Sequence, residues 1–135
     1  MLTYTPPKPS ATGFAAYSEL GLAQERMCVD LWPHITEFDG IVTAGDFHGV
    51  ALGSLVSASL GKPLMIVCAQ PHGEVVSHIV TIGDVHPDMR WLYVDDFCAF
   101  GASWAYVSGY LSQSEPANIV ARYQYTKRQY SRIEG

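Results

Sequence analysis

The chain has 135 residues, of which 48% are hydrophobic and 16% charged, and its net charge at neutral pH is -5. This length and composition predict one ordered globular domain with its own core, and they exclude a disordered tail. The acidic balance argues against a nucleic-acid-binding protein, whose surface carries an excess of Lys and Arg. It does not exclude a small anionic ligand, because backbone N–H groups bind phosphate without side-chain charge.

The cysteines and the apolar segments bear on location. The cysteines are scattered in apolar surroundings without a CxxC pair, so neither a disulfide framework nor a zinc knuckle is indicated. They are Cys28, Cys68 and Cys98. We therefore expect a reducing, cytoplasmic location. No signal-peptide pattern is seen at the start of the sequence. No apolar run approaches the length of about 20 residues that a membrane-spanning helix needs, so no membrane partner is expected.

The N-terminal part of the chain is predicted to be an arm followed by a helix. Residues 1–12 are rich in proline and predict an extended arm, which leaves 13–135 for the domain. Ser10 or Thr12 could cap a helix that continues to about Leu31, because apolar residues recur there at helical spacing.

Short apolar runs then alternate with helical patterns. Strands are predicted over 40–45, 63–69, 91–96 and 117–125, and helices over 50–60 and 101–111. Segment 70–90 carries Pro, Gly and His around a β-prone middle, which indicates a mobile or hairpin-like excursion. The basic segment 122–132 is open to two interpretations: a helix or solvated edge, or a segment that binds RNA or covers an active site. The alternation predicts a three-layer α/β fold with a mostly parallel sheet flanked by helices.

The predicted strand 91–96 ends in two carboxylates, Asp95 and Asp96. Carboxylates at a strand end can accept hydrogen bonds from the vicinal hydroxyls of a ribose. Small residues follow and open the next predicted helix, where backbone N–H groups form a phosphate site and Gly101 allows close approach. Ser103 adds a hydroxyl donor. A sugar 5-phosphate therefore fits this turn, and ligands of parallel sheets bind at the carboxyl ends of strands.

Two other interpretations of the acidic pair stay open. Asp95 and Asp96 could be a solvated strand end. They could also hold the metal of a nucleotide hydrolase, but that function requires a GxxxxGK[ST] loop. The Gly61-Lys62 pair precedes Pro63 and lacks the first glycine of that loop. The histidines show no HxH or HxxxH spacing, so no zinc site is expected.

Two stretches resemble a known family. LYVDDFCAFGAS resembles the phosphoribosyl-pyrophosphate (PRPP) motif of type I phosphoribosyltransferases. TAGDFHGVALGSLVSASLGKPLMIV is similar to the pyrophosphate loop of the same family with its following helix and strand, and AGDFHG is most similar to the orotate branch. Together they cover 39–69 and 91–112.

The resemblance implies Mg-dependent transfer of a phosphoribosyl group between PRPP and a nitrogenous base, in nucleotide synthesis or salvage. Asp95 and Asp96 would be the catalytic carboxylates that hold the ribose and favour positive charge on it. The 5-phosphate would be bound by Phe97, Cys98, Ala99, Phe100, Gly101, Ala102 and Ser103. The pyrophosphate would be bound by Ala44, Gly45, Asp46, Phe47, His48 and Gly49. Magnesium would be held through PRPP and by no protein side chain directly. A minimal hood and a homodimer are implied as well.

Some positions depart from the family pattern. Ala99 stands where purine-specific members place an acid, which argues against a hypoxanthine or guanine enzyme. Phe100 stands where many members have Thr, so a hydroxyl is missing from the phosphate site. Segment 70–90 falls at the position of the family's mobile catalytic loop, but it has no Lys and only Arg90.

Positive charge near the pyrophosphate would then have to come from another source. Three histidines could supply it only when protonated: His48, His72 and His78. Otherwise it would come from Lys8, from Arg122 or from a neighbouring subunit. The alternative function is a non-catalytic relative that binds PRPP or a nucleotide as a sensor or regulator.

Overall fold

The computed structural model describes residues 17–45, 47–70, 75–95, 102–113 and 118–133. The elements in chain order are α1 (Tyr17–Leu31), η1 (Trp32–His34), β1 (Gly40–Ala44), α2 (Phe47–Leu60), β2 (Leu64–Ala69), β3 (Val76–Ile82), β4 (Arg90–Asp95), α3 (Ala102–Gln113), β5 (Asn118–Gln124), η2 (Tyr125–Lys127) and β6 (Gln129–Arg132). The predicted arm, residues 1–12, lies outside the described residues.

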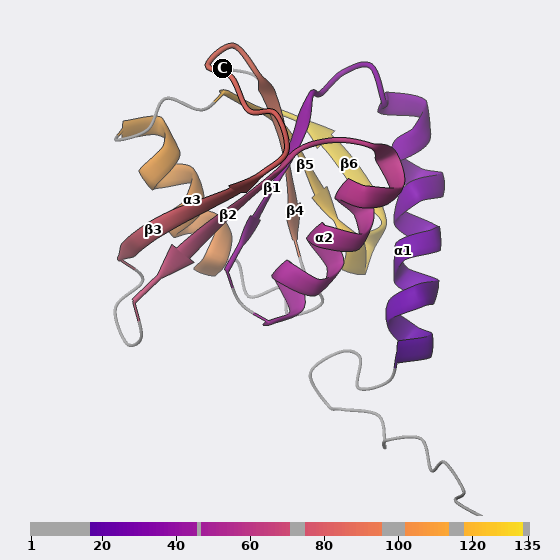
Figure 1. Ribbon diagram of the computed structural model, residues 1–135. Helices are drawn as coiled ribbons and strands as arrows, with labels where there is room; N and C mark the ends of the chain where they lie inside the picture. The colour runs from indigo at the N-terminus through magenta and orange to yellow at the C-terminus, as the bar shows by residue number, and fades with distance from the viewer. Residues whose placement is uncertain (1–16, 46, 71–74, 96–101, 114–117, 134–135) are drawn as a thin grey trace, which may run out of the picture.

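The strands form one six-stranded sheet in the order β3-β2-β1-β4-β5-β6. Strands β2, β1, β4 and β5 are parallel neighbours, whereas β3 and β6 run antiparallel at the two edges. Helices α1 and α2 cover one face of the sheet and α3 covers the other (Figure 1). The predicted three-layer, mostly parallel α/β fold is therefore confirmed.

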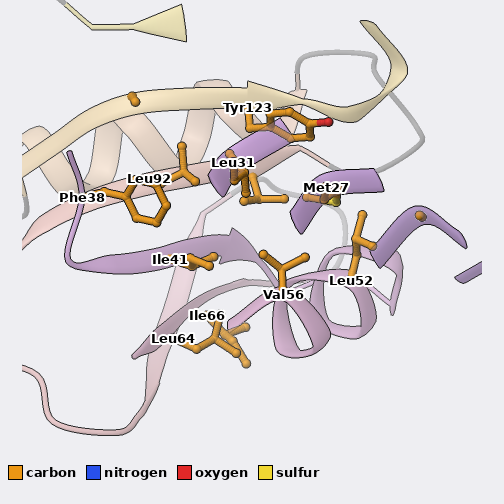
Figure 2. Close-up of a cluster of buried hydrophobic side chains, with 13 residues drawn as sticks. Met27, Leu31, Phe38, Ile41, Leu52, Val56, Leu64, Ile66, Leu92 and Tyr123 are labelled. Carbon is orange, nitrogen blue, oxygen red and sulfur yellow. The ribbon is translucent and has the colours of Figure 1, made fainter. Parts of the chain in front are cut away.

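The sheet is buried because each face carries its own apolar cluster. The cluster beneath α1 and α2 includes Met27, Leu31, Leu52 and Ile41, which lie between the helices and the central strands (Figure 2). The cluster on the other face includes Val107 of α3. Central strands buried on both faces read in sequence as continuous apolar runs, which is why β1, β2 and β4 were predictable.

Two predicted boundaries were wrong. Helix α2 begins at Phe47, earlier than the predicted 50–60, so Gly49, the second glycine of the AGDFHG stretch, lies inside its first turn. The strand predicted over 117–125 is not the last one, because β6 follows it and pairs with β5. The chain reverses there through η2 and Arg128, whose φ is 49°. Turns of this kind normally show Gly, Asn or Asp, and this one has none, so the sequence carries no turn signal.

Candidate functional site

The strand order changes direction between β1 and β4, which are adjacent and parallel. From β1 the chain passes through α2 to β2 on one side, and from β4 it passes through α3 to β5 on the other. The two connecting helices lie on opposite faces of the sheet (Figure 1). Such a switch point opens a crevice at the carboxyl ends of the two strands, and that is where ligands bind in open α/β sheets.

Gly45 sets the exit of the chain from β1. Its N–H donates to the carbonyl of Val67 at 2.8 Å, which holds the turn against the end of β2. A β-carbon at Gly45 would lie 2.8 Å from Cys68 Sγ and 3.0 Å from Cys68 Cα. Only glycine fits this approach, and α2 starts two residues later. The N–H groups of a helix start are an anion site, and here they begin at the switch point.

The predicted pyrophosphate residues divide between the strand, the turn and the helix. Ala44 is the last residue of β1, and Phe47, His48 and Gly49 form the start of α2 instead of the loop that was expected. Asp46 lies outside the described residues, and only the backbone of Phe47 and His48 is described. The pyrophosphate role of this segment stays a prediction.

Asp95 ends β4 and is buried, with 7% of its surface exposed. Its Oδ2 accepts a hydrogen bond from Arg122 Nε at 2.7 Å, and Arg122 comes from the adjacent strand β5. The Arg122 guanidinium lies over the ring of Trp104 at 4.8 Å, and Trp104 belongs to α3. The carboxylate therefore occupies an ordered position on the α3 face of the sheet.

Two opposing effects set the ionisation of Asp95. Burial raises the pKa of this carboxyl above its ordinary value, and the hydrogen bond and charge of Arg122 act against the rise. The ion pair carries no net charge when both groups are ionised. Asp95 therefore offers an oriented hydrogen-bond acceptor more than an isolated negative charge.

The rest of the predicted sugar-phosphate site is only partly within the described chain. Ala102 and Ser103 begin α3 at the same edge of the sheet as Gly45 and Asp95, and only their backbone is described. The other members lie outside the described residues: Asp96, Phe97, Cys98, Ala99, Phe100 and Gly101. Their roles stay predictions.

Arg90, the cation of segment 70–90, lies at the amino ends of the parallel strands, which we call the amino edge, opposite the carboxyl ends where Gly45 and Asp95 lie. Its side chain forms a two-pronged pair with Asp39, with Nε–Oδ2 and Nη2–Oδ1 distances of 3.0 Å, and it donates to the carbonyl of Thr36. Asp39 precedes β1 and Arg90 begins β4, so this pair closes the amino edge. Arg90 is therefore not placed to neutralise a pyrophosphate at the switch point.

The start of segment 70–90 does lie at the candidate site. The N–H of Gln70 donates to the carbonyl of Val75 at 2.8 Å, and β3 then returns antiparallel to β2. The hairpin-like expectation is confirmed for this part of the segment, whereas its mobility is not tested. His78 pairs across the sheet with Cys68, one of the residues beside Gly45. Residues 71–74, which include His72, lie outside the described chain.

Three further features bear on possible ligands. An open hollow of about 470 Å³ lies between the end of α2 and the end of β3, and its lining includes Lys62, Ile82 and Asp84. It is at the amino ends of the parallel strands, away from Gly45 and Asp95. Within the described ranges, no group of three or more His, Cys, Asp or Glu side chains is placed to hold a metal ion. None of the helices described is both long and apolar enough to traverse a lipid bilayer.

Several solved structures with the same architecture are phosphoribosyltransferases. Orotate phosphoribosyltransferase of Francisella tularensis is 14% identical, with a TM-score of 0.59 over 79% of this chain and 51% of that one. Adenine phosphoribosyltransferase of Saccharomyces cerevisiae, complexed with adenine and an imino-altritol bisphosphate, is 18% identical, with a TM-score of 0.60 over 79% of this chain and 67% of that one. The chain has the type I phosphoribosyltransferase fold.

A third structure with this fold contains bound phosphate compounds. Adenine phosphoribosyltransferase of Trypanosoma brucei, in complex with AMP, pyrophosphate and ribose 5-phosphate, is 16% identical, with a TM-score of 0.52 over 88% of this chain and 61% of that one. The chain thus spans about half to two thirds of these phosphoribosyltransferases. No family model and no curated protein matches the sequence.

Sequence reasoning missed the partner of Asp95. Arg122 was considered as a source of charge for the pyrophosphate, but it is engaged with the carboxylate and with Trp104. The two charges are far apart in sequence, and they meet because β4 and β5 are parallel neighbours with Tyr93 opposite Arg122. The signal that could have found the pair is the opposite charge of Arg122 on the strand predicted to follow Asp95.

Proposed function

We propose that the protein binds PRPP at the carboxyl ends of β1 and β4 and transfers its phosphoribosyl group to or from a nitrogenous base. The observation that carries the proposal is the meeting of three features at the switch point. These are the buried carboxylate of Asp95, the close turn at Gly45 and the starts of α2 and α3. A carboxylate suits the ribose hydroxyls, and helix starts suit the two phosphate groups.

In the proposed reaction the bond between the ribose C1 and pyrophosphate breaks, a bond from C1 to the base nitrogen forms, and the proton on that nitrogen is released. Asp95 and Asp96 accept hydrogen bonds from the ribose hydroxyls and orient the sugar. The start of α3, with residues 97–103, binds the 5-phosphate, and residues 44–49 with the start of α2 bind the leaving pyrophosphate. The N–H groups at the start of α2 stabilise the negative charge that develops on the pyrophosphate.

Magnesium fits this site through the ligand more than through the protein. Mg²⁺ takes oxygen ligands and keeps waters, and PRPP supplies diphosphate and hydroxyl oxygens. Asp95, the carboxylate that the structure describes at the switch point, already accepts a hydrogen bond from Arg122. A bound Mg²⁺ would supply positive charge to the pyrophosphate. A cytoplasmic location, a small hood and a homodimer belong to the same proposal.

One observation favours the second candidate, a non-catalytic sensor of PRPP or a nucleotide. In residues 75–90, the described part of segment 70–90, the one Lys or Arg side chain is Arg90. It pairs with Asp39 at the amino edge, away from the proposed pyrophosphate site. A protein that binds the ligand without releasing pyrophosphate needs less positive charge there than one that stabilises the departing group.

One experiment separates the two functions. The protein is incubated with Mg²⁺, PRPP and a panel of purine and pyrimidine bases while released pyrophosphate is measured. Its thermal stability is followed separately with PRPP and with nucleoside monophosphates. Stabilisation with release supports the transferase, and stabilisation without release supports the sensor. No stabilisation by PRPP or by nucleoside monophosphates would contradict both.

A matched pair of variants links the result to the site. Replacing both acids, Asp95→Asn with Asp96→Asn, should abolish ligand-dependent stabilisation, because an amide is a weaker acceptor for ribose hydroxyls than a carboxylate. The amide oxygen introduced at position 95 can still accept a hydrogen bond from Arg122, so the fold should survive. Asp88→Asn, in the exposed loop before β4, is the control and should bind as the wild type does.

A further inference from the structure

The side chain of Arg122 lies between the site carboxylate and an aromatic ring. Its Nε is 2.7 Å from Asp95 Oδ2, and its guanidinium carbon is 4.8 Å from the centroid of the Trp104 ring. The Arg122 side chain is 23% exposed and that of Asp95 is 10% exposed. Ion pairs this sheltered from water are screened far less than surface pairs.

The Trp104 ring is itself held in place. It packs against Tyr93 with a centroid separation of 5.0 Å, and Tyr93 stands opposite Arg122 in the strand register. Tyr93 and Asp95 are two residues apart on β4 and therefore point to the same face. The guanidinium is thus fixed from two elements, β5 and α3, and its position determines where the carboxylate can lie.

Arg122 is also the charged side chain that affects the ionisation of Asp95. From β5 the facing group is Arg122, from α3 it is the uncharged Trp104 and from β4 it is Tyr93. The adjacent strand β1 carries no charged or titratable side chain. Within the described ranges, Arg122 is the side chain that lowers the pKa of Asp95 against the effect of burial. Without it, burial alone would favour the protonated carboxyl, in which one oxygen carries a donating O–H and the group is a weaker acceptor for hydroxyls.

We propose that Arg122 is a positioning residue that keeps the Asp95 carboxylate oriented and ionised for the ribose hydroxyls. The inference rests on the proposed binding of PRPP at this edge. Arg122 acts through Asp95 and is not assigned to a phosphate or to the base. The sequence suggested Arg122 as a source of positive charge for the pyrophosphate. In the structure Arg122 is instead the ion-pair partner of Asp95.

The test compares two pH profiles in the wild type and in Arg122→Met. The first is the titration of the Asp95 carboxyl carbon, followed by NMR in the free protein. The second is the dissociation constant of ribose 5-phosphate, a probe that needs no metal, measured by calorimetry across the acid range. In Arg122→Met the Asp95 midpoint should rise by about 1–3 pH units, the size of the effect of an adjacent opposite charge. The loss of ribose 5-phosphate affinity should begin at correspondingly higher pH.

Two controls make the result specific. Arg122→Lys keeps the charge and should restore most of both profiles, so the proposal does not depend on the methionine variant alone. Arg132 on β6 pairs with Glu37, and the Arg132 side chain is 70% exposed. Arg132→Met removes this cation, and both profiles should stay as in the wild type. The titration of the ligand phosphate is common to all variants and cancels in the comparison.

The contradicting outcomes are distinct. An unchanged Asp95 midpoint in Arg122→Met, or a loss of affinity that is the same at every pH, would show a structural role only and overturn the inference while leaving the proposed function in place. A wild type that binds neither ribose 5-phosphate nor PRPP at any pH would overturn the proposed function, and the inference with it.

Discussion

Gly45 and Cys68 lie so close that a β-carbon on the first would be 2.8 Å from the thiol sulfur of the second. The backbone of Cys68 is also near, so a rotation of the thiol alone cannot make room. We predict that Gly45→Ala lowers the free energy of unfolding by about 1–3 kcal/mol, the usual cost of overpacking. It should also weaken stabilisation by PRPP, because the turn that starts α2 would shift.

Gly21→Ala is the matched control for this substitution, since a β-carbon there meets nothing within 4 Å. In the middle of α1 alanine should stabilise the protein by about 0.5–1 kcal/mol relative to glycine. Urea unfolding measures both variants. A Gly45→Ala protein as stable as the wild type would contradict the close packing of this turn.

Leu52 anchors α2, the helix that begins at the switch point, to the sheet (Figure 2). Its side chain is fully buried. Leu52→Ala should therefore lower the free energy of unfolding by about 2–5 kcal/mol, through lost burial and the cavity left behind. Val29→Ala, on the exposed side of α1, should stay within about 0.5 kcal/mol of the wild type. Equal losses in the two variants would contradict the observed layer packing.

Tyr123 connects β5 to α1 through its hydroxyl, which donates to Asp30 Oδ2. Burial and the adjacent carboxylate raise the pKa of this tyrosine, so the hydroxyl stays protonated and able to donate. Tyr123→Phe should lower the free energy of unfolding by about 1.5–3 kcal/mol, the range for a hydrogen bond to a charged group.

Arg128 also pairs with Asp30, with two contacts of 2.8 Å, so the carboxylate keeps a partner in the Tyr123→Phe variant. Tyr110→Phe is the control, because the described residues give its hydroxyl no hydrogen bond, and its effect should stay within about 0.5 kcal/mol. Chemical denaturation checks both variants, and a neutral Tyr123→Phe would remove the proposed link between α1 and β5.

The Asp39–Arg90 pair predicts a loss of stability in acid. Hydrogen bonds from the Arg90 side chain and backbone lower the pKa of Asp39 to about 2. A carboxyl with a lowered folded-state pKa stabilises the native protein above its unfolded value, near 3.9, and this contribution is lost as the pH falls toward the folded value. We therefore predict that the free energy of unfolding decreases between about pH 4 and about pH 2.

Urea unfolding at a series of acidic pH values tests this dependence. Asp39→Asn should flatten the decrease in that window, and so should 1 M salt, because the pair is partly exposed and screened. Asp88→Asn should keep the slope of the wild type. A slope in Asp39→Asn that parallels the wild type would show that other groups cause the acid loss.

The sequence pattern was enough to predict the buried strands and their order in the chain. Runs such as Leu64 to Ala69 and Trp91 to Val94 are continuously apolar, which is typical of strands covered on both faces. It also placed Gly45 and Asp95 at strand ends, because glycine and acidic residues interrupt those runs. The hairpin to β6 escaped prediction, since its reversal at Arg128 uses a left-handed conformation without glycine.

What the sequence by itself determined is local: apolar runs that must be buried, glycine where the backbone turns closely, and an acid where a strand ends. Only the tertiary structure decided which of these ends meet. In the structure β1 lies beside β4, Arg90 pairs with Asp39 at the amino edge, and Arg122 pairs with Asp95. Pairings of this kind depend on strand order and register, which are set by the packing of both sheet faces together and not by any one segment of the chain.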